Sequence, residues 1–468
     1  MIESWIIVSA ALLYLGALFL IAWLGDRHTR AAPSALGAGR LARRNGRGRP
    51  AIYALSLAVY CTSWTFYGSV GLATTTGLGF IPIYLGPILM YAVGWPLIIR
   101  IIRLAKSQNT TSIADFLAAR YGKSQSLAAL VAIVALLGLL PYLALQLKAV
   151  SLSLEALIGP TAFTSVMRPG LIAGDIAFSV ALLMAVFAVL FGTRHIDATE
   201  HQEGLMVAIA TESVVKLVAF LTVGAFVTWG IFGGLFDLAA RAAAVPHIAG
   251  LFDRPLPLAN WIATTLLSFC CILLLPRQFH VAVVENTSEL EVRRAAWMFP
   301  LYLVLINLFV VPIAIAGLLS FPAGAMPADS FVLGLPLSQG ADLTAMLAFI
   351  GGLSSATAMV IVESVALAIM ICNGLILPMI LHRRSAAGAT AGTAGQPDEQ
   401  DMGPLLIRIR RIVIFAVLGL AYLFYRTLGQ SGALASIGLL SFAAIAQLAP
   451  AFFGGLYWRA ATARGAIA

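Results

Sequence analysis

The sequence predicts an all-α polytopic membrane protein with about eleven transmembrane helices. Hydrophobic residues make up 60% of the 468 residues, mean hydropathy is +0.95 and only 10% of residues are charged. About a quarter of the residues of a soluble domain carry charge. Apolar runs of roughly 20 residues, the length that crosses a bilayer, recur from end to end. Basic residues gather in alternate loops between these runs.

The apolar runs give the expected order of helices. They lie near residues 4–24, 51–73, 79–102, 126–157, 174–192, 203–232, 257–276, 296–320, 342–372, 411–428 and 433–457. The first is expected to be a retained helix, because Glu3 precedes it and it is longer than the apolar part of a signal peptide. Residues 385–403 are small and polar, which predicts a flexible cytoplasmic linker.

The distribution of basic residues predicts the orientation in the membrane. Most of the 29 Lys and Arg residues fall in the loop after the first run or in alternate later turns. Examples are Arg49, Arg103, Lys106, Arg120 and Arg277. Because cytoplasmic loops are enriched in Lys and Arg, we expect the N-terminus outside and the C-terminus in the cytoplasm of a bacterial-type inner membrane. The net charge of +9 then reflects this orientation and not binding to nucleic acid.

The sequence shows no motif of a soluble enzyme. It contains no P-loop, no G-x-S-x-G and no H-E-x-x-H. The four cysteines lie in apolar runs without a C-x-x-C pair, which argues against a disulfide framework or a zinc site. We therefore expect neither an enzyme nor an organic cofactor.

Polar residues inside the second apolar run are the first candidate site, because polar groups at membrane depth need a partner or a wet cavity. The run reads Y-C-T-S-W-T-F-Y-G and contains Cys61, Trp64 and Thr65. A helix broken here would free backbone carbonyls for a cation and hydroxyls for a solute. The alternative is that the hydroxyls bond to their own helix while the glycines pack against neighbouring helices.

The ninth run supplies a second set of polar groups. Ser354 and Ser355 are adjacent hydroxyls that follow Gly351 and its neighbour. Oxygen ligands of this kind suit a hard monovalent cation, although small residues that pack one helix on another give the same string. Glu363 lies eight residues further, where it could guard a cation exit or accept an interhelical hydrogen bond.

Two charged residues of the sixth run lie on one helix face. Glu212 and Lys216 are four residues apart, a spacing that brings side chains together. Neutralisation of one by the other is one interpretation, and a proton relay is the other. Glu212, Lys216 and Glu363 are therefore candidate residues of a proton or ion path.

These motifs resemble the sodium:solute symporter family, which includes proline and sugar transporters. The similar segments are T-S-W-T-F-Y-G in the second run, S-I-A-D-F-L-A-A-R-Y-G at 112–122, H-Q-E-G-L-M at the start of the sixth run and L-S-S-A-T in the ninth. The second run looks most like the transporter-like sensory module of CbrA-type membrane sensor histidine kinases. The resemblance spans most of the chain.

The resemblance implies a LeuT-like core of two inverted five-helix repeats, here 50–236 and 256–459, preceded by an extra helix within 1–25. It also implies a sodium site formed by the carbonyls of Ala58, Cys61 and Gly351 and the hydroxyls of Ser354 and Ser355. Trp64, with its neighbour Thr65, would contact the solute.

The chain departs from the family in the seventh run. The family's G-Q-P-H becomes Arg277, Gln278, Phe279 and His280. The resemblance therefore leaves the solute open, and coupling to protons in place of sodium also stays open.

Two functions follow from these observations. The first is secondary transport of a small solute, expected to be an amino acid, coupled to sodium or protons by alternating access. The second is a sensory input module that binds the solute in the bilayer and signals to a histidine kinase domain beyond Ala468. An intramembrane enzyme or a channel is disfavoured, because neither paired catalytic residues nor a repeated filter segment is present.

Overall fold

The computed structural model describes residues 4–30, 48–158, 175–192, 202–252, 254, 257–382, 403–427 and 433–468. These residues are predominantly helical, and none of them lies in a strand. Within the described residues, six helices are long and apolar enough to cross a membrane, or nine if each of three bent helix pairs is one span. The protein is thus an all-α multi-pass membrane protein, as predicted. The predicted linker 385–403 lies outside the described residues, except for Gly403.

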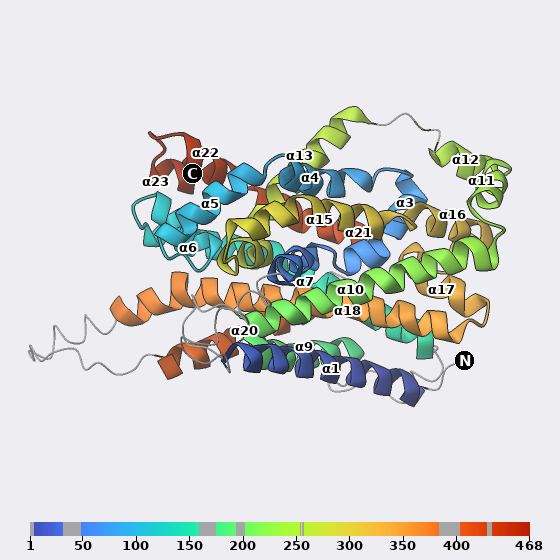
Figure 1. Cartoon of the computed structure of the whole chain (residues 1–468), viewed down its shortest axis with the longest axis horizontal. Helices are drawn as coiled ribbons and strands as arrows, with labels where there is room; N and C mark the ends of the chain where they lie inside the picture. The colour runs from blue at the N-terminus through green and yellow to red at the C-terminus, as the bar shows by residue number, and fades with distance from the viewer. Residues whose placement is uncertain are drawn as a thin grey trace, which may run out of the picture.

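The first half of the chain ends with a long helix through the middle of the molecule (Figure 1). Its elements are α1 (Ser4–Arg30), helical residues 48–56, η1 (Leu57–Tyr60), η2 (Trp64–Gly68), α3 (Ser69–Thr76), α4 (Ile81–Ala92), α5 (Trp95–Ser107), α6 (Ile113–Arg120), α7 (Gln125–Ile158), α9 (Ile176–Gly192), α10 (Glu203–Ala225) and η4 (Phe226–Ile231). The predicted second run is therefore several short pieces, because its helix is interrupted after Tyr60.

The second half begins with short helices where the sequence predicted an outer loop. Its elements are α11 (Leu235–Ala243), α12 (Pro246–Phe252), α13 (Leu258–Leu274), α14 (Pro276–Phe279), η5 (His280–Val284), α15 (Glu289–Asn307), α16 (Val310–Ser320), η6 (Ala328–Ser330), α17 (Phe331–Ser338), α18 (Asp342–Ile371), η7 (Cys372–Ile376), α20 (Gly403–Thr427), α21 (Leu434–Ala446), α22 (Ala449–Tyr457) and α23 (Ala463–Ile467). Helices α11 and α12 meet at an angle of 110°. They were not expected, since each is far shorter than a span.

Proline and glycine explain the bends in the other two pairs. Helices α4 and α5 meet at 71°, with Gly94 before α5 and a proline in its first turn. Helices α13 and α14 meet at 55°, where Leu275 is extended and precedes Pro276. A residue before proline is pushed out of the helical region, so α13 ends there. Each of the two predicted repeats therefore begins with an interrupted helix, although the repeat boundaries stay a prediction.

The long helix α10 organises the core. It packs against α1 on one side and α18 on another, and α18 also contacts α7 and α9. The N and C labels lie at opposite ends of the bundle, with α5, α6, α22 and α23 at one end and α11 and α12 at the other (Figure 1). The interrupted second span contacts α10 and α18 through η1. The candidate residues of the second, sixth and ninth runs thus meet in the interior.

Ion pairs link segments at the end of the bundle that carries α5. The guanidinium of Arg49 pairs with Glu203 at the start of α10 and with Glu291 in α15, where the Nε to Oε1 distance is 2.8 Å. Arg103 of α5 pairs with Glu289. These basic residues were predicted to share one side of the membrane, and they do lie together. Which side is cytoplasmic remains a prediction.

The position of Arg277 differs from the one expected from the sequence. It was expected in a turn facing the cytoplasm, but its side chain is 0% exposed and lies in the core. The reason is the bend at Pro276, which returns the chain into the bundle as α14 and carries Arg277 with it.

Candidate functional site

At the interruption of the second span, backbone carbonyls bond to side chains of other helices. Cys61 is extended, with φ −80° and ψ 97°, and a new helix starts at Trp64. Side chains from distant elements bind these oxygens: Gln278 Nε2 donates to Leu57 O at 3.4 Å, and Lys216 Nζ donates to both Ala58 O and Cys61 O at 2.7 Å. Unpaired backbone groups at membrane depth are costly, so these hydrogen bonds stabilise the interrupted helix.

The amide groups of the break are bonded by side chains as well. Ser63 N donates to Oε1 of Gln146 at 3.2 Å, and Trp64 N donates to Thr62 Oγ1 at 3.2 Å. The Thr62 hydroxyl is in turn 2.9 Å from the hydroxyl of Tyr142. Gln146 and Tyr142 both belong to α7. This helix therefore supports the amide side of the break, whereas Lys216 of α10 bonds to its carbonyls.

Lys216 supplies the positive charge of the site. Its side chain is 0% exposed, and its ammonium bridges the two carbonyls at 2.7 Å each. Hydrogen bonds from a charged donor are stronger than neutral ones. Glu212, one turn earlier on α10, accepts instead from Thr357 Oγ1 at 2.6 Å. Among the described residues the structure shows no ion pair between Lys216 and Glu212, so each is bound by its own partners.

The serines of the ninth run meet the same turn of α10. Ser354 Oγ donates to the backbone oxygen of Glu212 at 2.9 Å, and Ser355 Oγ donates to Gly351 O at 2.9 Å. A Cβ at Gly351 would lie 2.5 Å from the Cβ of Ala219. Helices α10 and α18 are therefore so close here that only glycine fits at this position. Three of the predicted cation ligands, Ala58, Cys61 and Ser354, thus bond to the turn of α10 that contains residues 212–216, whereas Ser355 bonds within α18.

A sodium ion does not fit beside Lys216 in this arrangement. Two of the predicted ligands, Ala58 O and Cys61 O, already accept from the ammonium. A second monovalent cation 4 Å away would be repelled by about 4 kcal/mol at an effective dielectric constant of 20. The two carbonyl oxygens therefore suit one positive charge, and Lys216 of the chain itself provides that charge.

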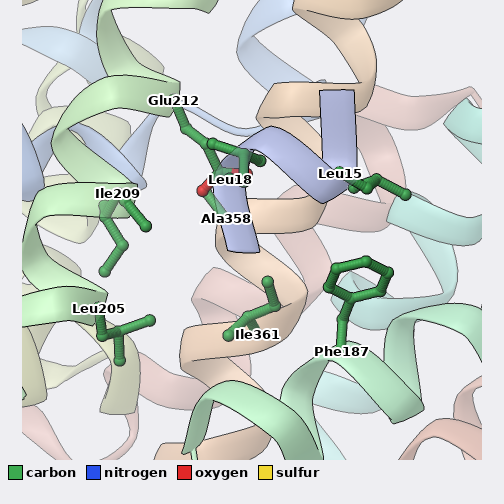
Figure 2. A pocket seen from close by; sticks show the side chains of 9 residues that line it. Leu15, Leu18, Phe187, Leu205, Ile209, Glu212, Ala358 and Ile361 are labelled. Atoms are coloured by element: carbon green, nitrogen blue, oxygen red, sulfur yellow. The ribbon is translucent and has the colours of Figure 1, made fainter. Parts of the chain in front are cut away.

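The Glu212 side chain points into a pocket between four helices, as Figure 2 shows. The pocket is apolar apart from this carboxylate, and α1, α9, α10 and α18 form its walls. Its lining residues are Leu15, Leu18, Phe187, Leu205, Ala208, Ile209, Glu212, Ala358 and Ile361. The extra first helix, α1, therefore covers the outer side of the charged turn of α10.

Arg277 and Glu363 form a fully buried ion pair. Nη1 of Arg277 lies 2.5 Å from Oε2 of Glu363, and both side chains are 0% exposed. The guanidinium also lies over the Tyr142 ring, 4.7 Å from its centroid, in cation–π contact. Among the described residues no acceptor lies within hydrogen-bond reach of Arg277 Nε and Nη2. Part of the guanidinium is thus available to another anion.

Trp64 lies at the wall of a small aromatic pocket. Its Nε1 donates to Ala435 O at 3.1 Å, and its neighbour Thr65 is 2% exposed. The pocket is lined by Trp64, Ile83, Tyr142, Gly438, Leu439 and Phe442. Its volume is about 10 Å³, which is near the minimum for one water molecule. A solute that enters this pocket must therefore move aromatic side chains or helices apart.

Sequence reasoning missed Arg277, Gln278 and Gln146 as parts of the site. Arg277 had a usable signal, because it directly follows a proline at the end of an apolar run and a charge there can be turned into the core. The bond from Lys216 to Cys61 had none, since it joins residues 155 positions apart.

Comparisons with known proteins place this geometry in a known fold. No protein-family model matches the chain. It is 24% identical over 316 residues to an uncharacterized symporter, YhjB, of Bacillus subtilis (strain 168), and the match covers 67% of this chain and 60% of YhjB. A solved structure of a Na⁺-coupled sialic acid symporter, in a substrate-bound outward-open state, aligns with a TM-score of 0.60 at 14% identity, covering 98% of this chain and 88% of that one. The chain therefore has the helical fold of a membrane symporter.

Proposed function

We propose that this chain carries a small solute across the membrane by alternating access, with solute binding coupled to a monovalent cation. The observation that carries the proposal is the interrupted second span, whose carbonyls at Ala58 and Cys61 bind a positive charge in the bundle interior. Broken helices that present carbonyls to a cation near the bilayer midplane are a feature of secondary transporters. The two symporters to which the chain is similar support the same class of function.

The solute is proposed to bind beside Trp64 and Thr65. Trp64 lines the aromatic pocket together with Tyr142, and the face of Tyr142 contacts Arg277. The guanidinium is therefore one side chain away from the pocket, with two nitrogens that lack an acceptor among the described residues. Arginine binds carboxylates through paired hydrogen bonds. A small amino acid, with its carboxylate directed toward Arg277, fits these features.

The test is uptake of labelled amino acids, led by proline and histidine, into proteoliposomes of the purified chain. Sodium and proton gradients are imposed together, and a matched preparation has neither. Accumulation above equilibrium only with the gradients supports the proposal. Trp64→Ala should abolish it, whereas Trp229→Ala, an exposed tryptophan of η4, should not.

Saturable binding without accumulation would favour the sensory module instead, since that function needs occupancy but no passage. The carboxylate assignment has its own control: proline should compete for the site and prolinamide, which lacks the carboxylate, should not. Loss of this discrimination in Arg277→Gln would identify the guanidinium as the group that reads the carboxylate.

A further inference from the structure

We propose that the ammonium of Lys216 takes the place of the sodium ion at this site, so that the chain is sodium-independent there. The inference rests on the proposed function for the role of this site in transport. The replacement of sodium is a statement about binding, and it is testable without any transport.

The first argument is the geometry of the ammonium. A bound sodium ion would join the broken second span to its neighbours through oxygen ligands. Lys216 makes that link from α10, with 2.7 Å bonds to Ala58 O and Cys61 O and a side chain that is 0% exposed. Because the cation is covalently attached to α10, the link cannot be lost by dissociation of an ion.

The second argument is the use of the serine hydroxyls. Both donate to backbone oxygens, Ser354 to that of Glu212 and Ser355 to that of Gly351, at 2.9 Å. They thus fasten α18 to α10 and bond within α18, as neutral hydroxyls do in membrane helices. In this arrangement the positive charge bonded to the second span is that of Lys216.

The experiment measures the unfolding midpoint of the purified full chain in detergent as NaCl replaces choline chloride at constant ionic strength. The wild type should show no saturable rise. Lys216→Ala removes the ammonium from the two carbonyls and should gain a saturable, sodium-specific rise of a few degrees, since a ligand that binds only the folded state raises its stability. Lys106→Ala, which removes a partly exposed lysine that donates to Asn286, is the matched control and should gain nothing.

Lys216→Met keeps the length of the side chain without its charge, so it preserves the test if the alanine variant does not fold. A saturable sodium-dependent rise in the wild type that is lost in Ser354→Ala with Ser355→Ala would overturn the proposal. So would the absence of any sodium response in a folded Lys216→Ala or Lys216→Met variant. Neither outcome depends on transport, so a failure here is distinct from a failure of the proposed function.

Discussion

The buried pair of Arg277 and Glu363 gives a prediction of defined size. Glu363→Gln leaves the guanidinium fully buried and without a counter-charge. Removing one partner of a buried pair destabilises a protein by about 3–5 kcal/mol. The glutamine amide oxygen can still accept one hydrogen bond, which contributes about 1 kcal/mol, so we expect a loss near the lower limit. The free energy of unfolding, measured by titration with denaturing detergent, should fall by about 3 kcal/mol.

Glu289→Gln is the matched control for this prediction. It breaks the pair of Arg103 with Glu289, whose side chains are 68% and 42% exposed. An exposed pair contributes about 0.2–1 kcal/mol, so its loss should be several times smaller. The double variant Arg277→Met with Glu363→Met should recover most of the stability, because apolar side chains of similar volume replace a buried pair at little cost. Equal losses for Glu363→Gln and Glu289→Gln, or additive losses in the double variant, would refute the reasoning.

Two further substitutions test the aromatic pocket and the broken span. Gly438→Ala would place a Cβ 2.5 Å from Cδ1 of Trp64. This overpacking should lower the free energy of unfolding by about 1–3 kcal/mol and shift the tryptophan fluorescence. Gly454→Ala is the control, because Gly454 has open space around it, and it should change neither quantity. Gln146→Leu removes the acceptor of Ser63 N–H, so unfolding should become easier by about 1–3 kcal/mol, and an unchanged midpoint would show that another group satisfies this amide.

Much of the fold followed from elementary patterns in the sequence. The last apolar run, 433–457, contains α21 and α22, and the ninth contains α18. The polar string around Cys61 raised a broken helix as one of two interpretations, because hydroxyls and glycines cluster there and a membrane helix tolerates irregular backbone only where partners exist. These features are local, and so a single stretch of sequence reveals them.

The partners of the break could not be predicted in the same way. Spacing along a helix places Glu212 and Lys216 on one face, and it suggested that they neutralise each other. In the structure Lys216 bonds to carbonyls of the second span and Glu212 to Thr357. That outcome depends on how α10 packs against two other elements, which no local pattern specifies. The same holds for Arg277, whose burial follows from the direction of the chain after Pro276.

The central claim is that a lysine cation has replaced sodium in a symporter fold. It is tested most directly by uptake of the labelled amino-acid panel into proteoliposomes with the two gradients imposed separately. The account predicts accumulation with the proton gradient in buffers free of sodium, and none with the sodium gradient alone. Accumulation driven by a sodium gradient alone, and unaffected by the proton gradient, would contradict it.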